Sequence, residues 1–243
     1  MSAIARGPGW AILHDPALVA EPGPELFDPA HWAGRMASEA ERGRGNLLFV
    51  VAGPRQWALR HYRRGGLAGR LVNDRYLWCG EALTRSFREW RMLARLHAAG
   101  LPVPRPVAAG WRRHGMSYEA DLATERIPDA VPLSARIATG SGIDWAAIGQ
   151  VIRAMHDAGA WHADLNAHNI LLDASDQPWL IDFDRGRFRA PGAWRQKNLA
   201  RLERSLRKIA EEPGAARFDP AGWATLRAGY AAGRGRRRRA SEP

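Results

Sequence analysis

The sequence contains one cysteine, Cys79, among 243 residues. A single cysteine excludes a disulfide within the chain and a zinc site built from cysteines, and we expect Cys79 to be a small buried residue. Runs of 18 or more apolar residues are also missing, which predicts no transmembrane helix. Residues 1–13 are interrupted by Arg6 and a Gly-Pro-Gly segment, and they lack the apolar stretch of a secretory signal. We therefore expect a protein that is soluble or held to a surface by charge.

Lysine is nearly absent as well. Lys197 and Lys208 are the two lysines, so the 36 basic residues are almost all arginine, and with 25 acidic residues the formal net charge is +11. This charge favours anionic partners: nucleic acid, phosphates or an anionic membrane face. Apolar residues make up 46% of the chain, which is enough for a packed core and excludes a disordered chain.

The apolar pattern changes character along the chain. In the first half, alternating or short apolar runs predict strands. In the second half, apolar residues recur mainly at helical spacing and predict helices. The expected strands are 46–51, 56–62, 107–111, 116–127, 170–172 and 179–181, and the expected helices are 83–99, one started by Asp144, 194–211 and 220–232. Segregated strands and helices indicate an α+β fold rather than a doubly wound parallel sheet.

The content of proline, glycine and arginine suggests where the chain divides into segments. Residues 1–30 hold five prolines and indicate a poorly periodic lead-in segment. We expect residues 31–128 and 129–232 to form the strand-rich and the helix-rich lobe. Residues 233–243 are rich in arginine and predict a disordered basic tail.

One polar loop carries the chemistry. It reads His-Ala-Asp-Leu-Asn-Ala-His-Asn over residues 162–169, between a helix and an apolar strand, and the next strand ends in Leu-Ile-Asp-Phe-Asp at residues 180–184. Asp164, Asn169 and Asp182 thus stand at the ends of adjacent short strands, where their oxygens can converge. Oxygen donors suit magnesium, and a carboxylate beside the metal can accept a hydroxyl proton. The alternative is that these residues only cap a hairpin.

The pattern His-x-Asp-x-x-x-x-Asn followed by Asp-Phe-Asp resembles the catalytic and metal loops of the two-lobed protein-kinase-like fold. The resemblance implies that Asp164 is the catalytic base, that Asn169 and Asp182 bind Mg²⁺, and that His162 supports the loop. The sequence of residues 162–172 and 180–186 is similar to the corresponding segments of the lipopolysaccharide core kinases, above all those that act on 3-deoxy-D-manno-octulosonic acid (Kdo). The similarity covers about residues 27–230.

This resemblance implies ATP-dependent phosphorylation of the 4-hydroxyl of Kdo on a lipid A precursor. It also implies a peripheral enzyme at the cytoplasmic face of the bacterial inner membrane, bound to an anionic surface, and no nucleic-acid partner is expected. Asp184 stands where the family pattern has glycine, and no long activation segment follows it. A short segment favours a small or carbohydrate acceptor over a protein.

The resemblance also assigns ATP-binding residues in the first lobe. Gly43 and Gly45 would be the remnant of a glycine-rich loop over the phosphates. Arg60 stands where the family usually has lysine, and arginine can still bind phosphates in a bidentate manner. Its expected partner is Glu89, with Glu81 as the second choice.

The remaining assignments concern adenine and the acceptor. We expect adenine to meet backbone groups near Glu125 to Ile127, with the nucleotide in the cleft of the two-lobed fold. Arg63, Arg64 and Arg70 belong to a segment of net charge +5 and would attract an anionic acceptor, unless they only form a solvated basic face. Two other functions stay open: a kinase of this fold for a core heptose, an aminoglycoside or a protein, and a non-catalytic nucleic-acid-binding module.

Overall fold

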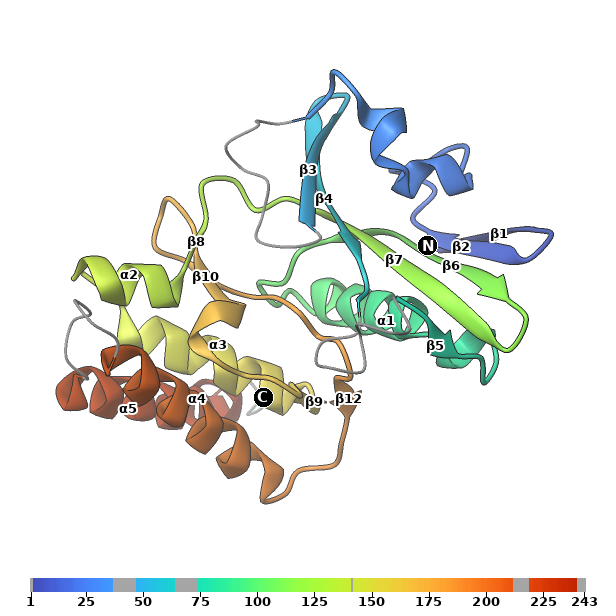
Figure 1. The fold of residues 1–243 in the computed structure, drawn as a ribbon. Helices are drawn as coiled ribbons and strands as arrows, with labels where there is room; N and C mark the ends of the chain where they lie inside the picture. Colours follow the sequence, from blue (N-terminus) through green and yellow to red (C-terminus); the bar gives the residue numbers. More distant parts are fainter. Residues whose placement is uncertain (1, 37–46, 64–73, 141, 212–218, 240–243) are drawn as a thin grey trace. The chain divides into compact units, whose positions relative to one another are not determined.

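The computed structural model describes residues 2–36, 47–63, 74–140, 142–211 and 219–239. The chain divides into two compact units: unit 1 comprises Met1–Ala94 and Pro104–Arg126, and unit 2 comprises Arg95–Val103 and Ile127–Pro243. Most strands belong to unit 1 and most helices to unit 2 (Figure 1). The expected α+β class is confirmed, and the division agrees with the two-lobed fold that the resemblance implies.

Unit 1 is built on an antiparallel sheet with the strand order β1-β2-β6-β7-β4-β3, and β5 pairs with β7. The predicted hairpin of β3 and β4 is confirmed, with Leu48 opposite Leu59. The strands are β1 (Ala3–Gly7), β2 (Trp10–His14), β3 (Leu47–Ala52), β4 (Arg55–His61), β5 (Tyr76–Leu77), β6 (Pro106–His114) and β7 (Ser117–Glu125).

The N-terminal segment is more ordered than its prolines suggest. Residues 3–14 form the hairpin β1–β2, and Ile12 of β2 lies opposite Gly110 of β6. The sequence pattern indicates only a poorly periodic lead-in segment and does not predict this hairpin. Pro8 and Gly9, which look like breakers in the sequence, form the turn of the hairpin. Two short 3-10 helices, Pro24–Phe27 and Pro29–Trp32, follow.

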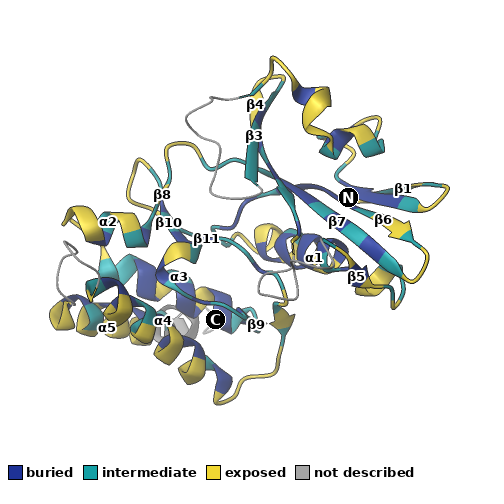
Figure 2. Ribbon diagram, viewed as in Figure 1, coloured by how far each residue is buried: buried dark blue, intermediate teal, exposed yellow. Residues whose placement is uncertain are grey.

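One helix, α1 (Arg85–Ala98), lies against the sheet of unit 1 (Figure 1). It corresponds to the helix predicted over 83–99, with its first turn replaced by a 3-10 helix at Glu81–Leu83. Along α1, buried residues alternate with exposed ones (Figure 2). Phe87 is fully buried, and the Ser86 hydroxyl donates to the backbone carbonyl of Gly110 at 2.7 Å. This side-chain contact fixes the start of α1 on strand β6.

Unit 2 carries the helices that hold the predicted polar loop. Asp144 caps α3, as expected, because its carboxylate accepts from the backbone N–H of Ala147 at 2.9 Å. The hairpin of β10 and β11 is also confirmed. The helices are α2 (Leu133–Thr139), α3 (Trp145–Asp157), α4 (Trp194–Ala210) and α5 (Pro220–Arg239), and the strands are β8 (Val131–Pro132), β9 (Ala160–Trp161), β10 (Ile170–Leu172), β11 (Pro178–Leu180) and β12 (Arg187–Phe188).

Two expectations about the ends and the cysteine need correction. Helix α5 continues to Arg239, seven residues beyond the predicted end at 232 and into the segment expected to be a disordered tail. Cys79 is exposed rather than buried, because it follows the short edge strand β5. Among the residues that the structure describes, no helix has the length and apolarity needed to cross a membrane.

Candidate active site

The predicted loop of residues 162–169 lies in unit 2 between strands β9 and β10. It ends in a short 3-10 helix, Ala167–Asn169, which Asn166 caps. The side-chain oxygen of Asn166 accepts from the backbone N–H groups of His168 at 2.8 Å and of Asn169 at 3.1 Å. The asparagine inside the motif therefore sets the turn that delivers Asn169 to the start of β10.

Asn169 joins the two halves of the predicted site. Its side-chain nitrogen donates to the backbone carbonyl of Asp164 at 2.9 Å, and its own carbonyl accepts from the backbone N–H of Ile181 at 3.1 Å. Asp182 follows directly, in the left-handed region with φ 61°, a conformation that few non-glycine residues adopt. Hydrogen bonds of Asn169 therefore join the segment that contains Asp164 to Ile181, the residue before Asp182.

His162 is buried beneath this loop and connects its beginning to its end. The backbone N–H of Asp164 donates to Nδ1 at 3.1 Å, so the proton on Nε2 is free to donate to the carbonyl of Ile181 at 2.9 Å. Burial lowers the pKa of His162 below its usual range, which keeps the ring neutral in this pattern. The imidazole also packs against Phe183, with ring centroids 4.8 Å apart. These contacts fit the structural role predicted for His162.

Helix α4 supplies a buried asparagine that the sequence reading did not identify. Asn198 donates to the carbonyl of His162 at 2.8 Å, and its oxygen accepts from the backbone N–H of His162 and from the ring of His156, both at 3.3 Å. The other ring nitrogen of His156 contacts the Tyr230 hydroxyl at 2.9 Å. One signal was present in the sequence: Asn198 interrupts the apolar stripe of Trp194 and Leu202, where a polar side chain must find buried partners.

Asp164 is half exposed, and it forms an ion pair with Arg201 of α4. The guanidinium Nε lies 2.9 Å from Oδ1 of Asp164, and Nη2 contacts the same oxygen. The sequence analysis does not predict Arg201 either, because nothing in the loop motif indicates which helix will lie beside the loop.

The donor set is compatible with magnesium that arrives with a nucleotide. Within the described ranges, no cluster of three or more His, Cys, Asp or Glu side chains is arranged to hold a metal ion. Asn169 and Asp182 offer one amide oxygen and one carboxylate, since the Asn169 nitrogen is engaged with Asp164. Magnesium commonly binds one or two protein oxygens and completes its shell with water and substrate phosphates. The residues present therefore fit Mg²⁺ as a partner of bound ATP.

In unit 1, the predicted pair of Arg60 and Glu89 is formed. The guanidinium of Arg60 lies 2.5 Å from the Glu89 carboxylate, which is 2% exposed and also accepts from the Tyr62 hydroxyl at 2.5 Å. Burial raises the pKa of Tyr62 well above its ordinary value, so the hydroxyl remains a donor. Glu81, the second choice, pairs with Arg6 instead.

The remaining residues that the sequence predicts for ATP and acceptor binding have few contacts that bear on these roles. The Glu125 carboxylate contacts Arg55, and Ile127 is the first residue after the chain leaves unit 1. Arg63 is exposed, with its guanidinium 3.5 Å from the Asp74 carboxylate. Four predicted residues lie outside the described part of the chain: Gly43, Gly45, Arg64 and Arg70.

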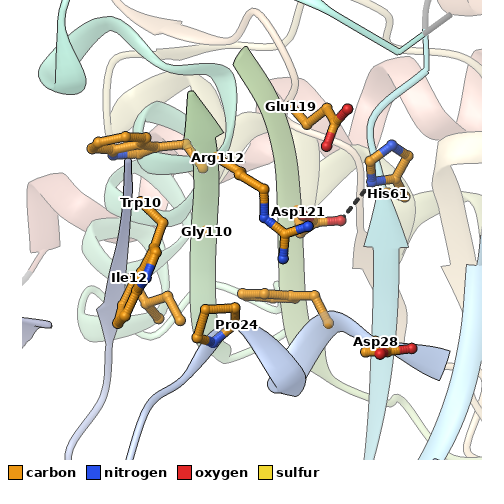
Figure 3. Close-up of a pocket in the computed structure, with 11 residues that line it drawn as sticks. Trp10, Ile12, Pro24, Asp28, His61, Gly110, Arg112, Glu119 and Asp121 are labelled. Carbon is orange, nitrogen blue, oxygen red and sulfur yellow. Dashed lines mark hydrogen bonds and ion pairs between the residues drawn. The ribbon is translucent and has the colours of Figure 1, made fainter. Parts of the chain in front are cut away.

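Unit 1 also contains a pocket of about 250 Å³ that none of the predicted site residues lines. Aromatic and acidic side chains surround it, and His61 contacts Asp121 across 2.6 Å (Figure 3). This hydrogen bond raises the pKa of His61 above its usual value. The residues that line the pocket all belong to unit 1, whereas Asp164, Asn169 and Asp182 belong to unit 2.

Comparison with known proteins supports the same reading. The model of the lipopolysaccharide kinase (Kdo/WaaP) family matches residues 30–230. A 3-deoxy-D-manno-octulosonic acid kinase of Stenotrophomonas maltophilia (strain R551-3) is 46% identical over 209 residues, which cover 85% of this chain and 84% of that protein. Proteins of the same name from Xanthomonas campestris pv. campestris (strain B100) and Xylella fastidiosa (strain 9a5c) are 48% and 47% identical, over 84% and 83% of this chain and 82% of each relative. The chain therefore belongs to the lipopolysaccharide kinase (Kdo/WaaP) family and is an enzyme, a phosphotransferase.

Proposed function

We propose that this protein transfers the γ-phosphate of ATP to the 4-hydroxyl of Kdo on a lipid A precursor, in the synthesis of the lipopolysaccharide core. The observation that carries the proposal is the hydrogen-bonded position of Asn169, which ties the Asp164 loop to the Ile181–Asp182 segment. Relatives named 3-deoxy-D-manno-octulosonic acid kinase support the choice of Kdo over heptose, aminoglycoside or protein acceptors.

In this proposal, Asp164 accepts the proton of the acceptor hydroxyl and orients its oxygen toward the γ-phosphorus. The new O–P bond forms as the bond to the β,γ-bridging oxygen breaks, and ADP leaves. Asn169 and Asp182 would hold Mg²⁺, which neutralises phosphate charge when it is bound. Positioning and electrostatic stabilisation supply most of the rate enhancement.

The residues of unit 1 would hold the nucleotide. Arg60, oriented by Glu89, binds ATP phosphates as the usual lysine would, because guanidinium and phosphate match as bidentate partners. Glu125 and Ile127 flank the backbone groups proposed for adenine, and Gly43 and Gly45 would cover the phosphates.

The acceptor is an anion, since the sugar named in the relatives is an acid. Arg63, Arg64 and Arg70 would attract it, and such surface charges act mainly on capture. The net charge of +11 supports peripheral binding of the protein to the anionic cytoplasmic face of the inner membrane, where the lipid acceptor would be met.

The test is transfer of labelled γ-phosphate from ATP to the Kdo-bearing lipid A precursor, with the phosphorylated position assigned by NMR. Asp164→Asn should retain ATP binding but lose transfer by a factor on the order of 10² or more, because the proton acceptor is gone. Glu21→Gln, at an exposed acidic residue of unit 1, is the control and should match the wild type.

Two results would contradict the proposal. One is full transfer activity in Asp164→Asn. The other is phosphorylation of a heptose, an aminoglycoside or a protein in preference to Kdo. Salt-sensitive DNA binding without any phosphate transfer would favour the nucleic-acid-binding alternative instead.

A further inference from the structure

The ion pair between Arg201 and Asp164 uses a single oxygen of the carboxylate. Both guanidinium contacts, from Nε at 2.9 Å and from Nη2, reach the same carboxylate oxygen, Oδ1. A bidentate pair would instead use one nitrogen for each oxygen. The second oxygen of Asp164, Oδ2, takes part in neither contact with Arg201. The pair therefore restricts the orientation of the carboxylate through Oδ1 and does not engage Oδ2.

Arg201 is one of three polar residues that α4 places along the loop. Asn198, three residues earlier, holds both backbone groups of His162, and the hydroxyl of Ser205, four residues later, accepts from the backbone N–H of Ala167 at 3.2 Å. Residues spaced by three and four share one face of a helix. Helix α4 thus contacts the loop at its beginning, at Asp164 and near its end, with Arg201 at the centre.

The exposure of the pair argues against a role in folding stability alone. The side chains of Arg201 and Asp164 are 48% and 49% exposed. Ion pairs this accessible to water contribute little to stability. Asn198, which is 3% exposed, already anchors the helix to the loop. A half-exposed arginine at the catalytic carboxylate is therefore better explained by the reaction than by the fold.

We propose that Arg201 is a positioning residue of the phosphoryl transfer, and this rests on the role proposed above for Asp164. By holding Oδ1, Arg201 restricts rotation of the carboxylate and directs Oδ2 to the acceptor hydroxyl. Rotational freedom at a catalytic group lowers the fraction of productive encounters, so the effect appears in kcat. Arg201 itself contacts neither ATP nor the acceptor in this scheme.

The experiment compares Arg201→Ala with Arg204→Ala in transfer to the Kdo-bearing lipid A precursor. Arg204 is an exposed arginine one turn further along α4, so both variants lose the same charge from the same helix. We expect Arg201→Ala to lower kcat by about 10- to 100-fold, with the acceptor KM within about twofold of wild type. Arg204→Ala should behave as the wild type.

Arg201→Lys is the second variant, and it keeps the charge if Arg201→Ala folds poorly. Its ammonium can hold a carboxylate oxygen only as a point charge, so we expect a partial recovery of kcat. Recovery by lysine distinguishes positioning from a purely structural contribution of the arginine stem. Thermal unfolding of each variant confirms that the folded protein is being assayed.

The outcomes separate this inference from the proposed function. If Asp164→Asn is inactive while Arg201→Ala keeps the wild-type kcat, the role of Arg201 is refuted and the proposed function stands. If Arg201→Ala raises the acceptor KM with kcat unchanged, Arg201 binds the acceptor anion, which also refutes positioning. If Asp164→Asn remains fully active, the proposed function itself fails.

Discussion

Glu89 shows how a single buried charge is held in unit 1. Its carboxylate is almost inaccessible to water. It accepts hydrogen bonds from Arg60, which lies in strand β4, and from Tyr62, which directly follows this strand. The Arg60 guanidinium also lies 4.5 Å from the centroid of the Tyr62 ring, where a cation is favoured. A charge buried in this way is stable only while its countercharge is present.

Arg60→Met is therefore expected to lower the free energy of unfolding by about 3 kcal/mol. This value is at the lower end of the range for breaking a buried ion pair, because Arg60 is partly exposed. Urea denaturation measures this change. Arg60→Lys should lose less, since it keeps the charge opposite Glu89. An Arg60→Met variant as stable as the wild type would show that the carboxylate is not dependent on Arg60.

The candidate site shows what residue patterns can and cannot reveal. Asp164, Asn169 and Asp182 were predictable because they lie within two short motifs beside apolar strands, and local spacing carried the signal. Arg201 and Asn198 come from a helix some thirty residues further on. Their contacts depend on how α4 packs against the loop, and helix periodicity indicates only which face of α4 is apolar.

At the scale of elements, the crossing of α3 and α5 depends on glycine. A Cβ added to Gly149 of α3 would lie 2.1 Å from the backbone carbonyl oxygen of Leu226 in α5. A Cβ at Gly229 of α5 would lie 2.3 Å from the carbonyl oxygen of Ala146 in α3. The two backbones approach so closely that neither position has room for a side chain. Helix α3 leads directly into β9 and the loop of residues 162–169, so this contact supports the position of that loop.

Gly149→Ala should destabilise the protein by about 3 kcal/mol, which is at the upper end of the range for overpacked cores. The reason is that the added methyl group would collide with the backbone of α5 rather than with a flexible side chain. Gly142→Ala is the matched control, since a Cβ there meets nothing within 4 Å. The unfolding midpoints of the two variants in urea provide the measurement. Equal midpoints would mean that α3 and α5 can separate without cost.

The predictable elements are those with a local signal. Strands β3 and β4, helix α3 with its Asp144 cap, and the hairpin of β10 and β11 follow from apolar alternation, helical spacing and turn residues. The hairpin β1–β2 was missed because proline and glycine in a tight turn look the same as proline and glycine in an irregular segment. Pairing with β6, about a hundred residues away, is what orders it.

At the scale of the whole molecule, the α+β class followed from the segregation of strand and helix patterns. The division into units did not follow chain order, however. Residues 95–103, which end α1 and follow it, belong to unit 2, and the Pro102 carbonyl accepts from the backbone N–H of Leu180 at 2.9 Å. Such a long-range contact leaves no periodic signature, so a boundary drawn along the sequence cannot include it.

The stability of the folded protein is expected to fall in mild acid because of His156. Burial lowers its pKa from 6.5 to about 4, and Arg195 and Arg153 oppose its protonation while Asp157 favours it. Above pH 6.5 the ring is neutral in both the folded and the unfolded chain. Between pH 6.5 and 4 the unfolded chain takes up a proton that the folded chain does not, so unfolding becomes easier as the pH falls.

This difference corresponds to about 3 kcal/mol of unfolding free energy lost by pH 4. His156→Gln removes the titrating ring, so its unfolding free energy should decline less than that of the wild type over this range, although the variant starts from a lower value at pH 7 because the contacts with Tyr230 and Asn198 are altered. Urea denaturation at several pH values gives both curves. His97→Gln, at an exposed histidine of α1, serves as the control and should follow the wild type. Parallel curves for wild type and His156→Gln would show that His156 is protonated as readily in the folded protein as in the unfolded chain. That result would contradict a neutral His156 ring hydrogen-bonded to Asn198 and Tyr230.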